Sequence, residues 1–161
     1  MCFDTNLQKQ LPNHVAFIMD GNRRWAKKKK LKIIDGHKKG SEIVKKIVKK
    51  SLEFDIKYLT FFSFSTENWS RSKDEIINLQ TLLSFYLDAE EEHFIKKKIK
   101  FSFIGEIDKF DNKIKLKLKN LQVRTRPFNK LHFTLALSYG SRSEIVNSIK
   151  KINKNINLLT E

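Results

Sequence analysis

The sequence predicts an α/β fold in which a mostly parallel central sheet carries helices on both faces. Strand-like apolar stretches alternate with helix-like stretches four times along the chain, an order that favours parallel pairing because parallel strands need long crossover connections. The first such stretch, Val15–Met19, is apolar without alternation, as in a central strand covered on both faces. A chain of 161 residues is long enough for one domain with its own core and too short for two.

We expect a single α/β domain over residues 14–161, preceded by a flexible N-terminal tail over residues 1–13. The tail shows no hydrophobic periodicity, and Pro12 favours an extended lead-in to the first strand. The sequence contains no run of 18 apolar residues and no signal-peptide pattern, and its one cysteine, Cys2, excludes a disulfide framework or a thiolate metal site. These features predict a cytoplasmic protein.

The net charge of +15 raises the question of a nucleic-acid partner, because clustered lysines attract phosphate backbones. Residues Lys27–Lys50 hold eleven lysines and two acids. Lysine, asparagine, isoleucine and phenylalanine are nevertheless enriched together along the chain, which indicates a general bias and not one selected basic face. We therefore expect no nucleic-acid partner, and a basic nucleic-acid or membrane-surface binding module is a remote alternative. A peripheral contact with anionic lipid headgroups is the better use of the charge.

Helical spacing of apolar residues identifies two central helices. The first is amphipathic over Ile43–Leu52, with lysines on its opposite face, and we expect it to begin near His37–Ser41. The second covers Ile76–Leu87 and follows Ser72–Glu75, which has the capping-box form. Its apolar residues occupy more than one stripe, so this helix is buried on most sides or else lines an apolar cavity.

Further stretches complete the predicted order of elements. The strands are Tyr58–Phe64, Lys100–Ile104 and Leu131–Ser138, and the helices are Asn112–Gln122 and Ile145–Ile152. The last strand alternates apolar and polar residues, and the last helix follows a second capping-box sequence that opens at Ser141.

A polar turn follows the first strand and is the first candidate for chemistry. It reads Asp20, Gly21, Asn22, Arg23 and Arg24. Gly21 and Asn22 favour a turn, and Asn22 can cap a helix whose free N–H groups favour an anion. One carboxylate, these donors and two guanidiniums together can hold a diphosphate and the magnesium ion that travels with it. An ordinary surface turn is the alternative.

A second polar turn follows the second strand, with Ser65, Thr66, Glu67, Asn68, Trp69 and Arg71. In open α/β sheets, ligands collect beyond the carboxyl ends of the strands, so we expect this turn to lie near Asp20. The alternatives are a turn residue for Asn68 and a core or lid aromatic for Trp69. His37 stands at the expected start of the amphipathic helix. A histidine there either caps or packs the helix, or it contributes to a binding site.

In their order, these motifs resemble a known family. The string from His14 to Ala26 is similar to the signature that opens the cis-prenyltransferases, the isoprenyl transferase or undecaprenyl diphosphate synthase family. The resemblance continues through Gly36–Gly40, Phe64–Arg71, Phe103–Gly105 and Tyr139–Arg142. It implies condensation of isopentenyl diphosphate with an allylic diphosphate, as in the synthesis of the undecaprenyl carrier of cell-wall precursors, and an undecaprenyl diphosphate synthase-like fold.

The resemblance also implies roles for individual residues. Asp20 is expected to hold Mg²⁺ against the allylic diphosphate, and Asn68, as the second catalytic residue, to orient isopentenyl diphosphate for loss of a proton. The residues implied in substrate binding are Gly21, Asn22, Arg23, Arg24, Trp25, His37, Ser65, Thr66, Glu67, Trp69 and Arg71. Glu75 is expected to anchor the closure made by Trp69 and Arg71. The helices at Ile43–Leu52 and Ile76–Leu87 are expected to wall a tunnel for the growing chain.

The sequence departs from the family pattern at two places. An arginine is usual where Ile33 stands, and Lys32 beside it is the candidate replacement, although a lysine cannot reproduce a bidentate guanidinium. A later Arg-Thr-Gly-Gly-Glu motif, which supplies isopentenyl diphosphate contacts and leads to a second metal ligand, does not occur. We therefore interpret the domain as incomplete at its C-terminal end. A truncated, non-catalytic chain or subunit that binds prenyl diphosphate is the main alternative, and the homodimer of the family is doubtful for this chain.

Overall fold

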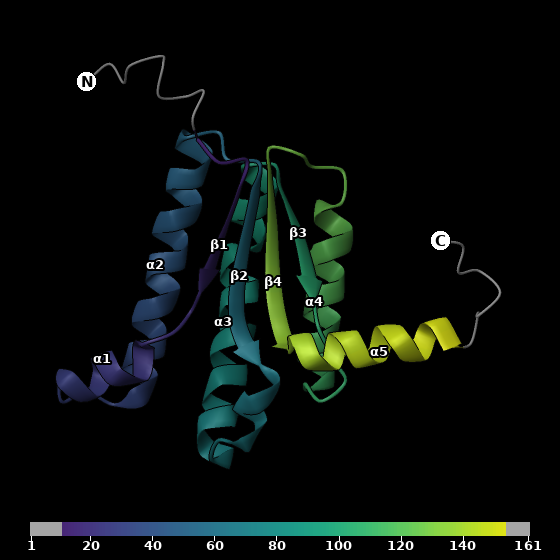
Figure 1. The fold of residues 1–161 in the computed structure, drawn as a ribbon. Coiled ribbons are helices and arrows are strands. Elements are labelled where there is room, and N and C mark those ends of the chain that lie inside the picture. The colour runs from purple at the N-terminus through teal and green to yellow at the C-terminus, as the bar shows by residue number, and fades with distance from the viewer. Residues whose placement is uncertain (1–10, 154–161) are drawn as a thin grey trace.

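A four-stranded parallel sheet in the order β1-β2-β4-β3 forms the centre of the computed structural model, which describes residues 11–153 (Figure 1). In chain order, the elements are β1 (His14–Ile18), α1 (Asn22–Lys28), α2 (Ile33–Glu53), β2 (Tyr58–Ser65), the 3₁₀-helix η2 (Thr66–Ser70), α3 (Lys73–Lys96), β3 (Ile99–Ile104), α4 (Asn112–Thr125), β4 (Leu131–Tyr139) and α5 (Ser141–Asn153). The predicted parallel α/β fold is confirmed.

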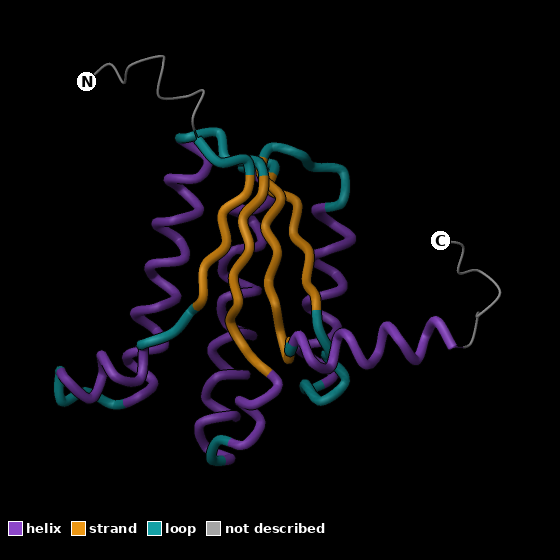
Figure 2. Tube along the Cα trace, viewed as in Figure 1, coloured by secondary structure: helices purple, strands orange, loops and turns teal. Residues whose placement is uncertain are grey.

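The strand register aligns the starts of β1, β2 and β4, and β2 continues to Ser65, beyond the Phe62 that pairs with the last residue of β1. His14 pairs with Tyr58, and Tyr58 pairs with His132 of β4, so the three strands start level and run the same way. Figure 2 shows the lower ends of these strands at one edge of the sheet, with a loop after β1 and a helical segment directly after β2. The polar turns after β1 and β2 therefore lie at a common edge, as the sequence predicts.

Helices α2, α3 and α4 all contribute to one apolar core on a single face of the sheet. Val48 of α2, Leu87 and Phe94 of α3 and Leu118 of α4 are buried in the same cluster as the strand residue Phe61. Figure 1 shows the strands in front of α3, so the view faces the other side of the sheet. Burial of this one face supplies the main driving force for folding.

The second face of the sheet is more open than the first within residues 11–153. On the second face Ile18 is 76% exposed and Ile104 is 41% exposed. Polar pairs occupy its middle: His14 Nε2 lies 2.9 Å from Thr60 Oγ1, and the hydroxyls of Ser102 and Thr134 lie 3.0 Å apart. Because these hydroxyl and imidazole groups can be hydrated, this face exposes less apolar surface to water than an all-apolar face would.

The prediction that the first strand is a central strand covered on both faces is wrong. β1 lies at an edge of the sheet and pairs with β2 alone among the described strands. Its side chains alternate between exposed and half-buried, with Val15 and Phe17 packed against the core and Ile18 exposed. An uninterrupted apolar run does not identify a central strand, because exposed apolar side chains are common on protein surfaces.

Helix α2 begins at Ile33, earlier than predicted, and two of its glycines contact α1. A Cβ atom on Gly36 would lie 2.2 Å from the backbone oxygen of Asn22, and one on Gly40 would lie 2.6 Å from the Asn22 side-chain nitrogen. The Gly36–Gly40 motif therefore lets α1 approach α2 closely. The approach fixes the polar turn after β1 relative to His37, which lies between the two glycines.

The capping predictions have mixed outcomes. At α3, the Ser72 hydroxyl accepts the backbone N–H of Glu75, which confirms that cap. At α5, the helix already includes Ser141, and the Glu144 carboxylate accepts the hydroxyl of Tyr139 and does not reach back to cap the helix. A cap sequence specifies which side chains can bond, but the neighbouring strand end offers Glu144 a different partner.

Most of the predicted N-terminal tail, residues 1–10, lies outside the described residues, as do residues 154–161 of the predicted domain. Within the described part, the Asn13 carbonyl accepts the backbone N–H groups of Lys57 and Tyr58, so this residue is joined to the sheet. None of the helices between residues 11 and 153 combines the length and hydropathy required to cross a bilayer.

We predict that Gly36→Ala destabilises the fold, although alanine is the better helix former by about 1 kcal/mol. The added methyl group would meet backbone atoms of Asn22 that cannot rotate away. We expect a loss of about 1–3 kcal/mol in the free energy of unfolding, measured by urea titration. Gly40→Ala should cost less because its neighbour is a side chain, and Lys39→Ala on the exposed face is the control. An unchanged midpoint for Gly36→Ala would contradict the close approach.

Candidate functional site

An apolar cavity with a polar mouth lies between α2, α3 and the covered face of the sheet. Its apolar walls come from Val44 and Val48 of α2, Leu79, Leu82, Leu83, Tyr86 and Leu87 of α3, and Phe101, Phe133, Leu135 and Leu137 of the sheet. Its volume is about 220 Å³, far above the roughly 10–15 Å³ that a single water needs. Of the two environments that the sequence allows for the apolar helix, α3 therefore has the one that lines a cavity.

The polar mouth of the cavity brings together residues from separate elements. Asn22 of α1, His37 of α2, Asn68 of η2 and Arg71 all line it. Three of the sequence-predicted binding residues and the predicted catalytic residue Asn68 therefore meet at one end of an apolar cavity. The other predicted residues are not in the cavity wall, and their positions follow below.

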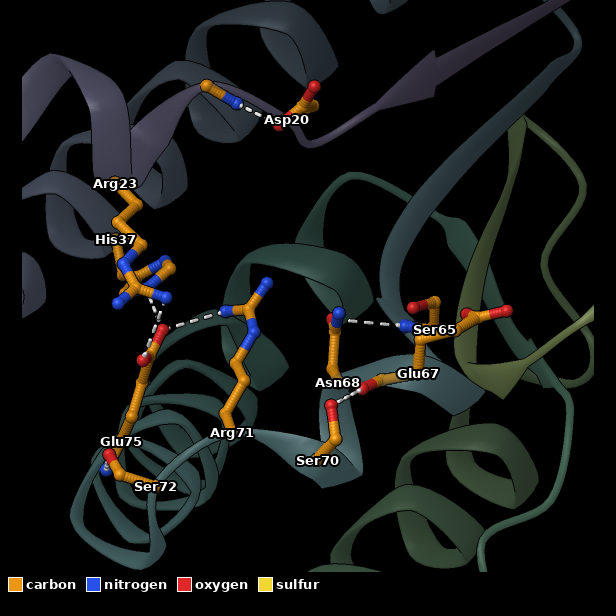
Figure 3. A network of polar contacts seen from close by, with 11 residues as sticks. Asp20, Arg23, His37, Ser65, Glu67, Asn68, Ser70, Arg71, Ser72 and Glu75 are labelled. Carbon is orange, nitrogen blue, oxygen red and sulfur yellow. Dashed lines mark hydrogen bonds and ion pairs between the residues drawn. The ribbon is translucent and has the colours of Figure 1, made fainter.

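Glu75, in the first turn of α3, gathers two guanidiniums and an imidazole (Figure 3). Its carboxylate, only 9% exposed, accepts a hydrogen bond from Arg71 Nη1 at 2.9 Å. Arg23 Nη1 of α1 lies 3.6 Å from Oε2, and His37 Nε2 of α2 lies 3.6 Å from Oε1. We call Arg23, His37, Arg71 and Glu75 the Glu75 cluster. It joins α1, α2 and the segment after η2 to α3.

His37 is the member of the Glu75 cluster whose hydrogen bonding is incomplete. Its Nε2 atom is buried and has no hydrogen-bond partner among the described residues. Burial lowers the pKa of the imidazole from its ordinary value, and the positive charge of Arg71 lowers it further, while Glu75 acts in the opposite direction. The unliganded site therefore favours a neutral His37 near neutral pH.

Asn68 is held by a reciprocal pair of hydrogen bonds with Ser65. The Asn68 Oδ1 atom accepts the backbone N–H of Ser65 at 3.2 Å, and the Ser65 hydroxyl accepts the backbone N–H of Asn68. The side-chain NH₂ of Asn68 donates to no partner among residues 11–153, and Asn68 borders the cavity mouth. The amide is thus oriented as a donor, which agrees with an orienting role and not with that of a base.

Trp69 belongs to the core more than to the cavity. Its ring packs against Phe64 and Phe110 at centroid distances of 4.8 and 5.0 Å, and its indole N–H donates to the Ser138 hydroxyl at 2.9 Å. Ser138 is buried and has a φ of 49°, a conformation that is strained for a non-glycine residue. The role of Trp69 in closing over a substrate stays a prediction.

Asp20 lies beyond the end of β1 with its carboxylate exposed to solvent. One carboxylate oxygen accepts the Gly21 backbone N–H at 2.5 Å, and the other accepts Arg24 Nη2 at 2.8 Å. Gly21 has the left-handed φ of 85° that suits glycine, and it stands at the N-cap of α1. The prediction that Asn22 caps this helix is wrong, because Asn22 is the first helical residue and its side chain packs against Gly40.

The remaining predicted residues lie around this centre. Trp25 is 38% exposed on α1. Thr66 packs so closely on Gly140 that a Cβ there would lie 2.5 Å from its hydroxyl. Glu67 is exposed, and a hydrogen bond from the Ser65 hydroxyl lowers the pKa of its carboxyl. Lys32 lines a second pocket, made mostly of polar residues, together with Arg23 and His37, next to the Glu75 cluster.

Two residues of the cavity wall were not predicted from the sequence. Lys45 Nζ lies 2.6 Å from Glu90 Oε1 and 5.0 Å above the ring of Tyr86, and both members of this ion pair line the cavity. Lys45 belongs to the lysine face of α2 that the sequence assigns to solvent. Only the packing of α3 against α2 could reveal this pair, since its members are far apart in sequence.

Comparison with known proteins places these motifs in a family. The family model described as "Putative undecaprenyl diphosphate synthase" matches residues 18–161. The chain belongs to the undecaprenyl diphosphate synthase family. An isoprenyl transferase of Thermotoga maritima is 40% identical over 91% of this chain. An undecaprenyl diphosphate synthase of Micrococcus luteus, described as specific for farnesyl diphosphate, is 41% identical over 89% of it.

Solved structures support the same membership in the undecaprenyl diphosphate synthase family. A probable undecaprenyl diphosphate synthase of Campylobacter jejuni matches 92% of the chain with a TM-score of 0.75 and 32% identity. Lavandulyl diphosphate synthase of Lavandula x intermedia, in complex with dimethylallyl diphosphate, matches 91% with a TM-score of 0.86 and 30% identity. The chain spans 63% of the Thermotoga relative and 57% of the Micrococcus relative.

We predict that two substitutions at Asn68 separate its structural role from its donor role. Asn68→Asp keeps the oxygen that accepts the Ser65 N–H and should leave the free energy of unfolding within about 0.5 kcal/mol of the unmodified protein. Asn68→Ala removes that oxygen and should cost about 1 kcal/mol, as for other capping side chains. Thermal unfolding followed by circular dichroism measures both. Equal stability of the two variants would contradict the Ser65–Asn68 pair.

Proposed function

We propose that the chain is an isoprenyl transferase that condenses isopentenyl diphosphate with an allylic diphosphate. The observation that carries this proposal is the cavity with an apolar interior and a mouth bordered by His37, Arg71 and Asn68. An allylic diphosphate has a matching division into a hydrocarbon tail and a polyanionic head. The diphosphate interacts with cationic side chains at the mouth, and the hydrocarbon tail is shielded from water in the interior.

The printed names of the relatives support the same substrate class. The Micrococcus enzyme is described as specific for farnesyl diphosphate, and the lavandulyl diphosphate synthase structure contains dimethylallyl diphosphate. Both compounds are allylic diphosphates of different length. We extend this class to the present chain because its binding residues at the cavity mouth match the family motifs.

In this proposal, the chain's residues act on the leaving group and on the second substrate. Arg23, Arg71 and His37 stabilise the negative charge that develops on the diphosphate as the allylic carbon–oxygen bond breaks. The NH₂ group of Asn68 orients isopentenyl diphosphate, which forms the new carbon–carbon bond and then loses a proton to the released diphosphate or to Asp20. The walls of the cavity exclude water, which would otherwise trap the allylic cation.

Mg²⁺ is proposed to bind through Asp20. Among residues 11–153 no three His, Cys, Asp or Glu side chains gather as metal ligands, so a cage made by the protein alone does not fit. Mg²⁺ commonly uses only one or two carboxylates together with substrate phosphates and waters, and the exposed Asp20 carboxylate fits that mode. The ion would supply charge neutralisation to the diphosphate.

The direct test is incorporation of radiolabelled isopentenyl diphosphate, with farnesyl diphosphate as acceptor, together with calorimetric binding of farnesyl diphosphate. Chain-length analysis of the products would establish the transfer. Binding without incorporation would instead support the non-catalytic prenyl-diphosphate-binding chain, which the coverage of only 63% of the Thermotoga relative keeps as a second candidate. If the chain shows no binding of farnesyl diphosphate and no incorporation of isopentenyl diphosphate, the proposal is overturned. A cytoplasmic location and a peripheral membrane contact stay predictions.

We predict that Asp20→Asn removes the enhancement of farnesyl diphosphate binding by Mg²⁺. Asparagine keeps an oxygen for the Gly21 N–H but lacks the charge that an Mg²⁺ ligand supplies. Calorimetric titrations with and without Mg²⁺ measure the effect. Asp55→Asn is the matched control, because Asp55 is an exposed acid on the turn between α2 and β2. If Asp20→Asn shows undiminished magnesium dependence, Asp20 is not the ligand.

We also predict that Leu83→Trp makes the cavity favour a shorter prenyl diphosphate over a longer one. Leu83 lines the cavity wall, so a larger side chain there reduces the space for the tail. Affinity for farnesyl diphosphate should fall about tenfold or more, whereas affinity for dimethylallyl diphosphate should change little. Phe85→Trp on the same helix is the control, because Phe85 is 61% exposed. An equal loss for both ligands would contradict a tail site at Leu83.

A further inference from the structure

The Glu75 cluster has an arrangement of charge that depends on one carboxylate. Two guanidiniums, Arg23 and Arg71, and the His37 imidazole come from three different segments and approach the same two oxygen atoms of Glu75. Arg23 is 51% exposed and Arg71 is 27% exposed, so water competes for both. A buried carboxylate compensates these cations and limits the conformations of two long side chains.

His37 Nε2 is the atom of this cluster that needs a partner. It lies 3.6 Å from Glu75 Oε1, beyond a normal hydrogen bond, and it is buried without any hydrogen bond among the described residues. The same side chain lines the cavity mouth. A phosphate oxygen that enters the mouth is an acceptor that Nε2 lacks in the empty site.

We propose that Glu75 is a positioning residue that holds Arg23, His37 and Arg71 at the cavity mouth, and that His37 takes up a proton when a diphosphate binds there. The inference rests on the proposed function in one respect, namely that the ligand of the mouth is a diphosphate. It goes further by assigning a proton to the binding step and a role to a side chain that does not line the cavity.

The direction of the proton exchange follows from the surrounding charges. In the empty site, burial and the guanidinium of Arg71 lower the pKa of His37, with a smaller contribution from Arg23, and Glu75 only partly opposes them. Lys32 and Asp74, which line the adjoining polar pocket with His37, are the other charged groups nearby. A bound diphosphate adds several negative charges and favours the imidazolium form.

The pKa of His37 is therefore higher in the complex than in the free protein. Between these two pKa values, binding takes up a proton, so the affinity for a diphosphate decreases as the pH rises through that window. By thermodynamic reciprocity, the proton and the diphosphate stabilise each other on the protein. No such exchange is expected if His37 is only a packing residue.

The first experiment uses the unmodified chain and inorganic pyrophosphate with Mg²⁺. Titration of the imidazole proton resonances by NMR should give His37 a higher pKa in the complex than in the free protein. His14, His93 and His132 serve as internal references. Calorimetry in buffers of different ionisation enthalpy should show a larger proton uptake for the unmodified protein than for His37→Asn, which isolates the contribution of His37 from that of pyrophosphate itself.

The second experiment tests the positioning role of Glu75. Glu75→Gln preserves the shape of the side chain but removes its charge, so the pKa of His37 in the free protein should fall further. The dissociation constant of pyrophosphate should increase about tenfold because Arg23 and Arg71 are no longer held. Glu75→Asp should restore part of the affinity. Glu92→Gln removes an equal charge from an exposed position near the other end of α3 and should leave the affinity nearly unchanged.

These outcomes distinguish the two levels of the proposal. If the unmodified chain binds no pyrophosphate, the proposed function fails together with its site. If pyrophosphate binds but His37→Asn takes up as many protons as the unmodified protein, the proton step is overturned while the function stands. Tighter binding by Glu75→Gln would show that the carboxylate competes with the ligand, and it would overturn the positioning role.

Discussion

The Glu75 carboxylate is 9% exposed and lies between two guanidiniums and an imidazole. A charge at this depth is tolerable only while opposite charges and hydrogen bonds compensate it, because desolvation of an unpaired ion is expensive. The groups that compensate it are carried by α1, α2 and the segment after η2. Electrostatic compensation of one side chain therefore determines how three separate segments meet at the mouth of the cavity.

Close backbone packing places α1 within reach of this carboxylate. Gly36 and Gly40 allow Asn22 of α1 to lie directly on α2, and this contact brings Arg23 toward Glu75. The same two glycines flank His37, so one short motif controls both the contact between the helices and the position of the imidazole. What these two glycines contribute is the absence of a side chain, which allows close packing, and not their greater backbone freedom.

The one-sided core explains why the cavity can exist. Helices α2 and α3 both pack on one face of the sheet, and the space between them is lined by apolar side chains such as Val48, Leu83 and Phe133. A largely apolar space with polar groups gathered at its mouth favours an amphiphilic ligand over a fully polar one. Among residues 11–153, Lys45 is the one lysine that lines this cavity, so the lysine-rich composition contributes little to this selection.

Local chemistry within the sequence determined the order of strands and helices, the Ser72 cap and the two polar turns after β1 and β2. These features depend on residues a few positions apart, so periodicity and motif spacing were sufficient to predict them. Tertiary structure alone decided that β1 is an edge strand, that Ile18 and Ile104 are exposed on the second face of the sheet, and that Lys45 joins Glu90 at the cavity wall. It also placed Trp69 in the core and gave His37 a buried atom without a partner. Such features arise from contacts between segments distant in the chain, and no local pattern specifies which of several compatible partners a side chain meets.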